Sequence, residues 1–279
     1  IISTWQSVYN LPKKWFQQFG MVIGDEAHLF KAVSLTKIMN KLEKCKYRVG
    51  LTGTLDGSKT HKLVLEGVFG SVNKVTSTNI LQERNQLAKL KIYCLTLQHK
   101  DIKCRFDYRE EMDYLVNHKG RNKYIRNLCI ALKGNTLCLF QFVEKHGKDL
   151  RELIAEKAKD KKVFYVHGGI DTDEREYIRQ ITEKSDNAII IASYGTFSTG
   201  INIRNLHNIV FSSPSKSRIR NLQSIGRGLR LKDNKSDATL YDISDNMTYN
   251  GVHNYTLRHF EERLNIYKEE KFNYEIHKV

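Results

Sequence analysis

Short apolar runs alternate with amphipathic stretches through the first 90 residues. Residues 21–24 form a continuous apolar run of strand length, residues 35–42 have apolar positions at helical spacing, and residues 47–51 are again typical of a strand. Strands that alternate with helices predict a parallel sheet covered on both faces. Residues 1–4 resemble the end of a strand followed by a polar turn, so we expect the chain to begin within a domain.

A second block cycles regularly between strands and helices. It opens with a polar stretch at 98–107 and a helix expected over 108–132. The expected strands are then 136–142, 162–166, 188–192, 208–211 and 238–243, and the expected helices are 148–158, 173–182 and 219–226. This alternation is typical of a doubly wound α/β domain. A charged amphipathic helix is expected over 255–271.

These patterns divide the chain into three expected parts. Residues 1–90 would be the C-terminal part of a first α/β domain, residues 91–250 a complete second domain, and residues 251–279 a C-terminal helix. The junction between the two domains is expected near residues 88–95. A length of 279 residues is enough for two domains that each bury a core.

The chain is strongly basic, with 46 Lys and Arg against 31 Asp and Glu and a formal net charge of +15. The excess is spread along the whole sequence. Such a charge favours a polyanionic partner, because neutralising phosphates releases condensed counterions. A basic enzyme with no nucleic-acid partner is equally compatible with the composition.

Other classes of protein are disfavoured. The five cysteines include no CxxC pair, which argues against a disulfide framework and a zinc site and favours a reducing compartment. No apolar run approaches the roughly 18 residues needed to span a bilayer, and no signal sequence opens the chain. We therefore expect a soluble protein of the cytoplasm, that of the host cell if the protein is viral, and no membrane partner.

Two adjacent carboxylates, Asp25 and Glu26, follow directly after the apolar run 21–24. Ligands of parallel sheets bind outside the carboxyl ends of the strands, where a nucleotide would be held. Phosphoryl transfer uses one carboxylate to hold Mg²⁺ through its water shell and a second to orient the attacking water. Taken alone, the acidic pair is more typical of a solvated helix N-terminus.

Two arginines, Arg227 and Arg230, lie three residues apart in the segment 223–230 (QSIGRGLR). On one helix they would share a face, and guanidinium groups offer a planar, permanently charged fork to phosphate oxygens. Gly226 and Gly228 permit a close approach of the backbone. Taken alone, the arginines are more typical of a basic helix end that complements the helix dipole.

The order of the motifs favours a phosphate site over the two alternatives, a solvated helix N-terminus for the carboxylates and a basic helix end for the arginines. The motifs are 3–6 (STWQ), 25–28 (DEAH), 51–54 (LTGT), 166–169 (VHGG) with Arg175, 192–196 (ASYGT) with 198–202 (STGIN), and 223–230. They resemble motifs Ib, II, III, IVa, V and VI of superfamily 2 helicases, in the order of that family and across nearly the full chain. The resemblance implies two RecA-like domains of the P-loop NTPase type, the first truncated at its N-terminus, with ATP between them and nucleic acid across both.

The resemblance also implies roles for individual residues. Asp25 would hold Mg²⁺, Glu26 would be the catalytic base, and the arginines would reach the terminal phosphates as arginine fingers. The implied ATP-binding residues are Asp25, His28, Gly200, Asn202, Gln223, Arg227 and Arg230. The ATP site would be coupled to the nucleic acid by His28, Thr52 and Thr54. The nucleotide state would be linked to the domain interface by His28 and Gln223. The implied nucleic-acid contacts are Ser3, Thr4, His167, Gly168, Gly195, Thr196 and Thr199, which would bind the backbone without specifying sequence.

One motif of the family is absent from these 279 residues. A motor of this type needs a GxxxxGK[ST] loop whose backbone amides and lysine bind the phosphates. The segment 53–60 (GTLDGSKT) comes near this pattern but places one residue between the glycine and the lysine. We expect this chain by itself to bind ATP weakly without turning it over.

Two long stretches, 1–32 and 193–234, resemble a bacteriophage member of the family. The resemblance implies an ATP-dependent helicase that remodels branched DNA and RNA paired to DNA, in replication, recombination and repair. The sequence leaves the oligomeric state open, and we expect a monomer. Two alternatives remain open. One is a nucleic-acid-binding module without catalysis, and the other is a translocase subunit that moves on duplex DNA without separating its strands.

Overall fold

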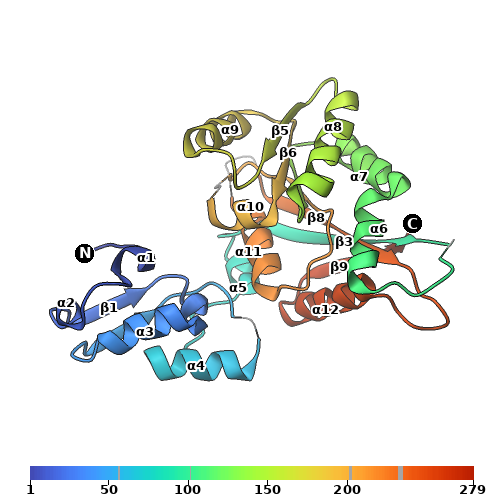
Figure 1. Cartoon of the computed structure of the whole chain (residues 1–279). Helices are drawn as coiled ribbons and strands as arrows, with labels where there is room; N and C mark the ends of the chain where they lie inside the picture. The colour runs from blue at the N-terminus through green and yellow to red at the C-terminus, as the bar shows by residue number, and fades with distance from the viewer. Residues whose placement is uncertain (56, 101, 201–202, 232–234) are drawn as a thin grey trace. The chain divides into compact units, whose positions relative to one another are not determined.

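The computed structural model describes residues 1–55, 57–100, 102–200, 203–231 and 235–279, with side chains omitted for 198–200. The chain forms two compact units, Ile1–Val75 and Thr76–Val279 (Figure 1). The division therefore comes before the expected junction at 88–95. Helix α5 (Thr78–Glu83) and strand β3 (Lys89–Gln98) already belong to the second unit.

The first unit contains a two-stranded parallel sheet and short helices. Strands β1 (Met21–Gly24) and β2 (Tyr47–Gly50) pair in the register Gly24↔Gly50. The other elements are α1 (Trp5–Val8), α2 (Lys13–Phe16), the 3₁₀ helix η1 (Ala27–Lys31), α3 (Val33–Lys41) and α4 (Lys59–Phe69). The apolar face of α3 packs with Phe16, Leu42 and Cys45 in a small core. This core is the main buried apolar cluster of the unit.

The second unit is built on a seven-stranded parallel sheet in the order β5-β6-β4-β7-β8-β3-β9. Its strands, apart from β3, are β4 (Thr136–Phe140), β5 (Lys162–Val166), β6 (Ala188–Ser193), β7 (Asn208–Phe211), β8 (Asp237–Asn246) and β9 (Asn273–Lys278). Its helices, apart from α5, are α6 (Tyr108–Asn117), α7 (Lys119–Ala131), the π-helix η2 (Val143–Gly147), α8 (Lys148–Lys157), α9 (Thr172–Lys184), α10 (Tyr194–Gly200), α11 (Arg218–Gly228) and α12 (Tyr255–Glu269).

Both faces of this sheet are covered. Alternate residues of each central strand enter two separate apolar clusters, so that Leu137 and Leu139 of β4 pack on one side and Cys138 and Phe140 on the other. Side chains from α9, α10, α11 and α12 complete the first cluster, and side chains from α7 and α8 complete the second. The near-continuous apolar runs of the central strands follow from this burial on both faces.

Strand β3 corrects the expected junction at 88–95. It lies between β8 and β9, and its residues Leu90, Ile92 and Cys94 are buried in the core. Their alternation with polar neighbours is the pattern of a strand, and it identifies this segment as part of a sheet and not as a linker.

Two expected helices also differ from the structure. The helix expected over 108–132 is broken at His118, whose side chain accepts a hydrogen bond from the backbone N–H of Arg121 and caps α7. The C-terminal segment 251–279 is more than a helix, because β9 follows α12 and extends the sheet beside β3. Arg263 of α12 is buried against Asp242 of β8, so this arginine packs within the unit.

Candidate functional site

The acidic pair lies where β1 ends. Asp25 and Glu26 follow Gly24 directly, and both side chains are exposed. Glu26 adopts left-handed backbone angles (φ 49°, ψ 49°), which are uncommon for a residue other than glycine. The Oδ1 atom of Asp25 accepts a hydrogen bond from the backbone N–H of Glu26 at 2.9 Å. The turn between β1 and η1 thus directs two carboxylates to the carboxyl end of the sheet.

His28 connects this turn to the segment 51–54. The ring is buried, and its Nδ1 atom lies 3.0 Å from the Oγ1 atom of Thr52. The Thr52 hydroxyl donates its one proton to the carbonyl of Thr54 at 2.9 Å, so it accepts at His28, whose Nδ1 carries the hydrogen. The same Nδ1 lies 3.3 Å from Oε2 of Glu26. His28 therefore contacts both the acidic pair and the threonine segment.

Backbone contacts hold the two segments together. The N–H of Ala27 donates to the carbonyl of Leu51, and the N–H of Leu51 donates to the carbonyl of Gly24, each at 2.8 Å. A Cβ at Gly50 would lie only 3.0 Å from that of Ala27, so glycine at this position favours the close approach of the segments. The structure thus brings together four of the predicted residues, which are Asp25, Glu26, His28 and Thr52.

The arginine segment lies at the end of α11 in the second unit. Arg227 is in the last turn of the helix, and its guanidinium carbon lies 5.9 Å from the ring centre of Phe197. Helix α11 ends at Gly228, so Arg230 lies beyond it, and the expectation that both arginines share one helical face is wrong. A Cβ at Gly228 would lie 2.3 Å from Cδ1 of Ile209, so the end of the helix packs closely against β7. Gln223, on the same helix, is half-buried.

Helix α10 follows β6 without a loop. The hydroxyl of Ser193 accepts a hydrogen bond from the backbone N–H of Thr196 and lies 2.8 Å from its Oγ1 atom. Thr196 is 7% exposed, whereas Gly195 is exposed, so Gly195 is the more accessible of these two predicted contacts. Thr199 and Gly200 lie in the last turn of α10, where side chains are not described, and Asn202 lies outside the described residues.

His167 follows the edge strand β5. Its ring is half-buried and packs on Tyr165 at 5.0 Å, and its Nδ1 atom accepts from the backbone N–H of Gly169 at 3.1 Å. Gly168 is exposed, and Arg175 of α9 donates to its carbonyl at 3.2 Å and to that of Ile170 at 2.6 Å. Arg175 therefore orders the turn that contains the two predicted nucleic-acid contacts.

The remaining predicted contacts lie at the start of the chain. Ser3 and Thr4 precede α1 and are exposed. The Oγ1 atom of Thr4 lies 2.9 Å from the hydroxyl of Ser7. These contacts are local, so the structure brings neither residue into the turn that contains Asp25 and Glu26.

Comparisons with known proteins bear on this arrangement. Residues 120–232 match the model of the helicase conserved C-terminal domain. The chain is 38% identical, over 98% of its length, to the ATP-dependent DNA helicase uvsW of Enterobacteria phage T4, of which it covers 57%. The crystal structure of T4 UvsW matches with a TM-score of 0.59 at 37% identity, over 99% of this chain and 57% of that one. Over nearly its full length the chain is therefore similar to superfamily 2 helicases.

More distant relatives of this chain agree in fold. It is 24% identical to the putative ATP-dependent RNA helicase L396 of Acanthamoeba polyphaga mimivirus, over 98% of this chain and 52% of the relative. The restriction-modification enzyme LlaBIII bound to DNA has a TM-score of 0.69 at 15% identity, over 99% of this chain and 23% of that one. The predicted α/β fold of the RecA-like type is confirmed. The chain spans about half the length of its phage T4 and mimivirus relatives.

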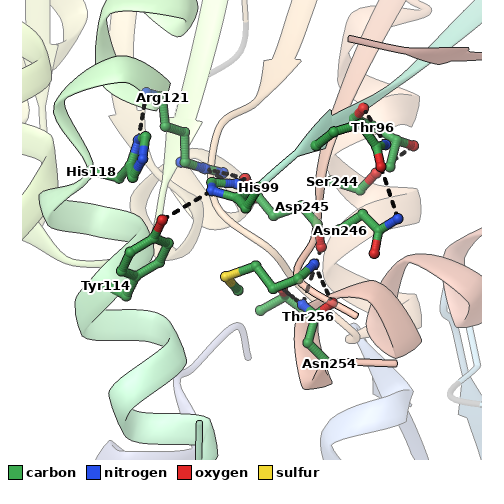
Figure 2. A network of polar contacts seen from close by, with 12 residues as sticks. Thr96, His99, Tyr114, His118, Arg121, Ser244, Asp245, Asn246, Asn254 and Thr256 are labelled. Atoms are coloured by element: carbon green, nitrogen blue, oxygen red, sulfur yellow. Dashed lines mark hydrogen bonds and ion pairs between the residues drawn. The ribbon is translucent and has the colours of Figure 1, made fainter. Parts of the chain in front are cut away.

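A buried polar network lies at the carboxyl ends of β3 and β8, and the sequence pattern did not predict it (Figure 2). Asp245 is fully buried, and its carboxylate accepts from Nε of Arg121 at 2.9 and 3.0 Å. Nε2 of His99 lies 2.9 Å from the same carboxylate, and Tyr114 lies 3.3 Å from the other ring nitrogen. Burial raises the pKa of Asp245, but the charges and hydrogen bonds of Arg121 and His99 outweigh burial and leave this pKa below its usual value.

A second missed residue is Lys235, which is 4% exposed and donates to three backbone carbonyls. The polar segment around it predicts a solvated loop, so no local signal distinguishes it. Among the described residues, no three or more His, Cys, Asp or Glu side chains form a metal-binding group. Within the same residues no helix is long and apolar enough to cross a membrane.

Proposed function

We propose that this protein is an ATP-dependent DNA helicase or translocase that uses Mg²⁺ and remodels branched DNA and RNA–DNA hybrids in replication, recombination and repair. The observation that most directly supports the proposal is the contact of His28 with both Thr52 and Glu26, at 3.0 and 3.3 Å. It joins the candidate hydrolytic carboxylate to a segment that, in this family, communicates with the nucleic acid. The 38% identity to the ATP-dependent DNA helicase uvsW supports the choice of DNA.

Asp25 fits a magnesium ion. Its carboxylate is exposed at the end of β1, and one of its oxygens accepts only a local backbone hydrogen bond. Mg²⁺ is commonly held by one or two carboxylates together with water and substrate phosphates, so a larger protein cage is not required. The ion would neutralise charge on the phosphates of ATP, and Asp25 would hold it in place.

Glu26 is placed to orient the attacking water. Its left-handed backbone turns the side chain beside His28, and the Nδ1 hydrogen of His28 faces its carboxylate oxygen at 3.3 Å. Because Thr52 shares this hydrogen, a movement of the segment 51–54 would alter the hydrogen bonding of Glu26. We propose that this change in the hydrogen bonding of Glu26 couples nucleic-acid binding to ATP hydrolysis.

The residues of the second unit would act on both ligands. Arg227 and Arg230 would stabilise charge on the terminal phosphates, and Gln223, Gly200 and Asn202 would bind the nucleotide. Contacts to the sugar-phosphate backbone of the nucleic acid would come from Ser3 and Thr4 of the first unit and from five residues of the second, which are His167, Gly168, Gly195, Thr196 and Thr199. Such contacts give affinity that falls as salt rises.

ATPase measurements on the full-length protein test this proposal. We expect branched DNA to stimulate hydrolysis, and Glu26→Gln to lower kcat by about 10²-fold or more while nucleotide binding remains, because removing a positioned base costs roughly 10²–10⁴. Glu43→Gln is the matched control, since Glu43 is an exposed carboxylate of the same unit that pairs with Lys13. Normal turnover in Glu26→Gln would rule out the proposed mechanism.

A strand-displacement assay separates the helicase from the translocase. A helicase releases a strand from forked DNA in the presence of ATP, whereas a duplex translocase hydrolyses ATP and releases none. Absence of ATP hydrolysis with and without DNA, while DNA binding is retained, would instead indicate a nucleic-acid-binding module.

A further inference from the structure

Lys235 is a buried cation whose hydrogen-bond partners are neutral backbone carbonyls. Its Nζ atom lies 2.5 Å from the carbonyl oxygen of Gly228, 2.9 Å from that of Arg230 and 3.1 Å from that of Arg204. A lysine ammonium has three N–H donors and no acceptor, so these three carbonyls match its donors one for one. Burial lowers the pKa of Lys235 to about 8.

Two of the carbonyls belong to the turn that contains the candidate arginines. The last carbonyls of a helix have no partner within the helix, and cations are favoured at that end. Lys235 binds the carbonyls of Gly228 and Arg230, and the backbone N–H of Ala88 donates to the intervening carbonyl of Leu229 at 2.8 Å. The three successive carbonyls of Gly228, Leu229 and Arg230 therefore each accept a hydrogen bond.

Packing leaves this turn little freedom. The side chain of Leu229 is fully buried, and Gly228 lies so close to Ile209 that a Cβ would clash at 2.3 Å. The turn is thus held by the sheet on one side and by Lys235 on its polar side. Without the ammonium, the carbonyls of Gly228 and Arg230 would each lose the hydrogen bond that Lys235 donates, and the loss of a buried hydrogen bond is costly.

The third carbonyl extends the contact to another candidate segment. Arg204 follows the segment 192–202, and its backbone N–H donates to the carboxylate of Glu183 at 2.5 Å. Lys235 therefore joins the backbone that follows the candidate ATP-binding residues of that segment to the turn after α11.

We propose that Lys235 is a positioning residue for Arg227 and Arg230, and that its ammonium fixes the turn from which both guanidinium groups extend. The positioning of the turn stands on the contacts of Lys235 with the backbone, and only its consequence for hydrolysis rests on the proposed function. Misplacing a reacting group by about 1 Å can cost on the order of 10²-fold in rate. Lys235, which does not contact the substrate, would thus control how well the two arginines reach the phosphates of ATP.

Hydrogen exchange tests the positioning directly. Lys235→Met keeps the length of the side chain and removes its donors, and we expect amides within 225–231 to exchange about tenfold faster, since tenfold corresponds to roughly one lost hydrogen bond. Lys161→Met is the matched control, because Lys161 is a lysine of the same unit that donates to the carbonyl of Leu132 after α7. The control should leave exchange within 225–231 unchanged. Unchanged exchange there in Lys235→Met would overturn the proposal.

Kinetics of the full-length protein test the consequence. We expect Lys235→Met to lower kcat for ATP by about 10²-fold with a smaller change in KM, and Lys161→Met to leave kcat unchanged. Added to the double variant Arg227→Ala/Arg230→Ala, Lys235→Met should cause little further loss, because that background already lacks both guanidinium groups that Lys235 positions. Fully multiplicative losses would show that Lys235 acts elsewhere and would overturn the proposal.

Two further results remain decisive. If Lys235→Met does not fold, as judged by circular dichroism, Lys235→Leu provides the same two measurements with a shorter side chain that also has no donor. If the wild-type protein shows no ATPase, the proposed function fails, and the exchange of 225–231 still decides whether Lys235 fixes the turn.

Discussion

The two units use similar apolar strands in different ways. In the second unit, β6 (Ala188–Ser193) is buried at every residue, because helices cover both faces of the sheet. In the first unit, β1 (Met21–Gly24) is equally apolar, but Met21 and Ile23 are 52% and 58% exposed. An apolar run therefore predicts a strand, while its burial depends on what the rest of the fold places against it.

Polar contacts differ between the units in the same way. The Arg263–Asp242 and Arg121–Asp245 pairs of the second unit are almost fully buried, whereas the Lys13–Glu43 pair of the first unit is more than half exposed. Buried pairs become costly when one partner is lost, and exposed pairs contribute little. Both tryptophans, Trp5 and Trp15, lie in the first unit, so their fluorescence reports on that unit separately.

The largest effect is expected from Arg263→Met. It removes the guanidinium from the buried carboxylate of Asp242 and leaves that carboxylate the hydroxyl of Tyr267, a neutral donor. The loss should lower the free energy of unfolding of the second unit by about 3–5 kcal/mol. Urea denaturation followed by far-ultraviolet circular dichroism measures it. Lys13→Met is the control and should cost less than about 1 kcal/mol. Equal losses in both variants would contradict the distinction between the units.

The next effect is a pH dependence caused by His146. Burial lowers the pKa of this histidine to about 3, and its ring nitrogens lie 3.2 Å from Ser213 and Asn122. The unfolded chain takes up a proton below about pH 6.5 and the folded unit does not, so stability is full above that pH and falls as the pH drops toward 3. The slope should be about 1.4 kcal/mol per pH unit.

Comparing variants isolates this slope. His146→Gln should lose this part of the pH dependence, measured as the free energy of unfolding between about pH 6.5 and about pH 4.5. His253→Gln, at an exposed histidine paired with Glu261, should retain it. The same slope in wild type and His146→Gln would show that other groups cause it.

A smaller effect is expected from glycine substitutions. Gly228→Ala places a methyl group 2.3 Å from Cδ1 of buried Ile209 and should cost about 1–3 kcal/mol, which Ile209→Val should partly restore by removing that atom. Gly24→Ala in the first unit meets ring atoms of Phe30 and Phe69 at 2.9 Å and should cost less. Denaturation monitored by circular dichroism and by tryptophan fluorescence checks each unit. A larger loss from Gly24→Ala would reverse the comparison.

Much of the fold follows from local pattern. The apolar runs predict the strands at Met21–Gly24, Lys162–Val166 and Asn208–Phe211 with the bounds that the structure shows, because turn residues and polar segments flank each run. Strand β3 escapes this reasoning because its alternating pattern stands next to a polar stretch that is typical of a linker. The pattern also merges the helices α6 and α7, because the cap at His118 depends on side-chain geometry that periodicity does not reveal.

The candidate site likewise combines residues that the sequence indicates with contacts that only the structure shows. The order of the motifs alone indicates the helicase family and names Asp25, Glu26, Arg227 and Arg230, because phosphate chemistry restricts which side chains serve. Their roles remain predictions. The contact between His28 and Thr52, 24 residues apart, depends on the pairing of β1 with β2.

The alternation of strands and helices and the residue types offered to a nucleotide follow from the amino-acid sequence alone, because both are contained in short stretches of chain. The burial of Lys235 against three carbonyls, and the enclosure of Asp245 by Arg121 and His99, arise from the packing of the whole second unit. Asp245 meets partners that lie 124 and 146 residues away along the chain, and Lys235 meets the end of a helix. A charge is buried only where such partners converge, and no local pattern encodes that convergence.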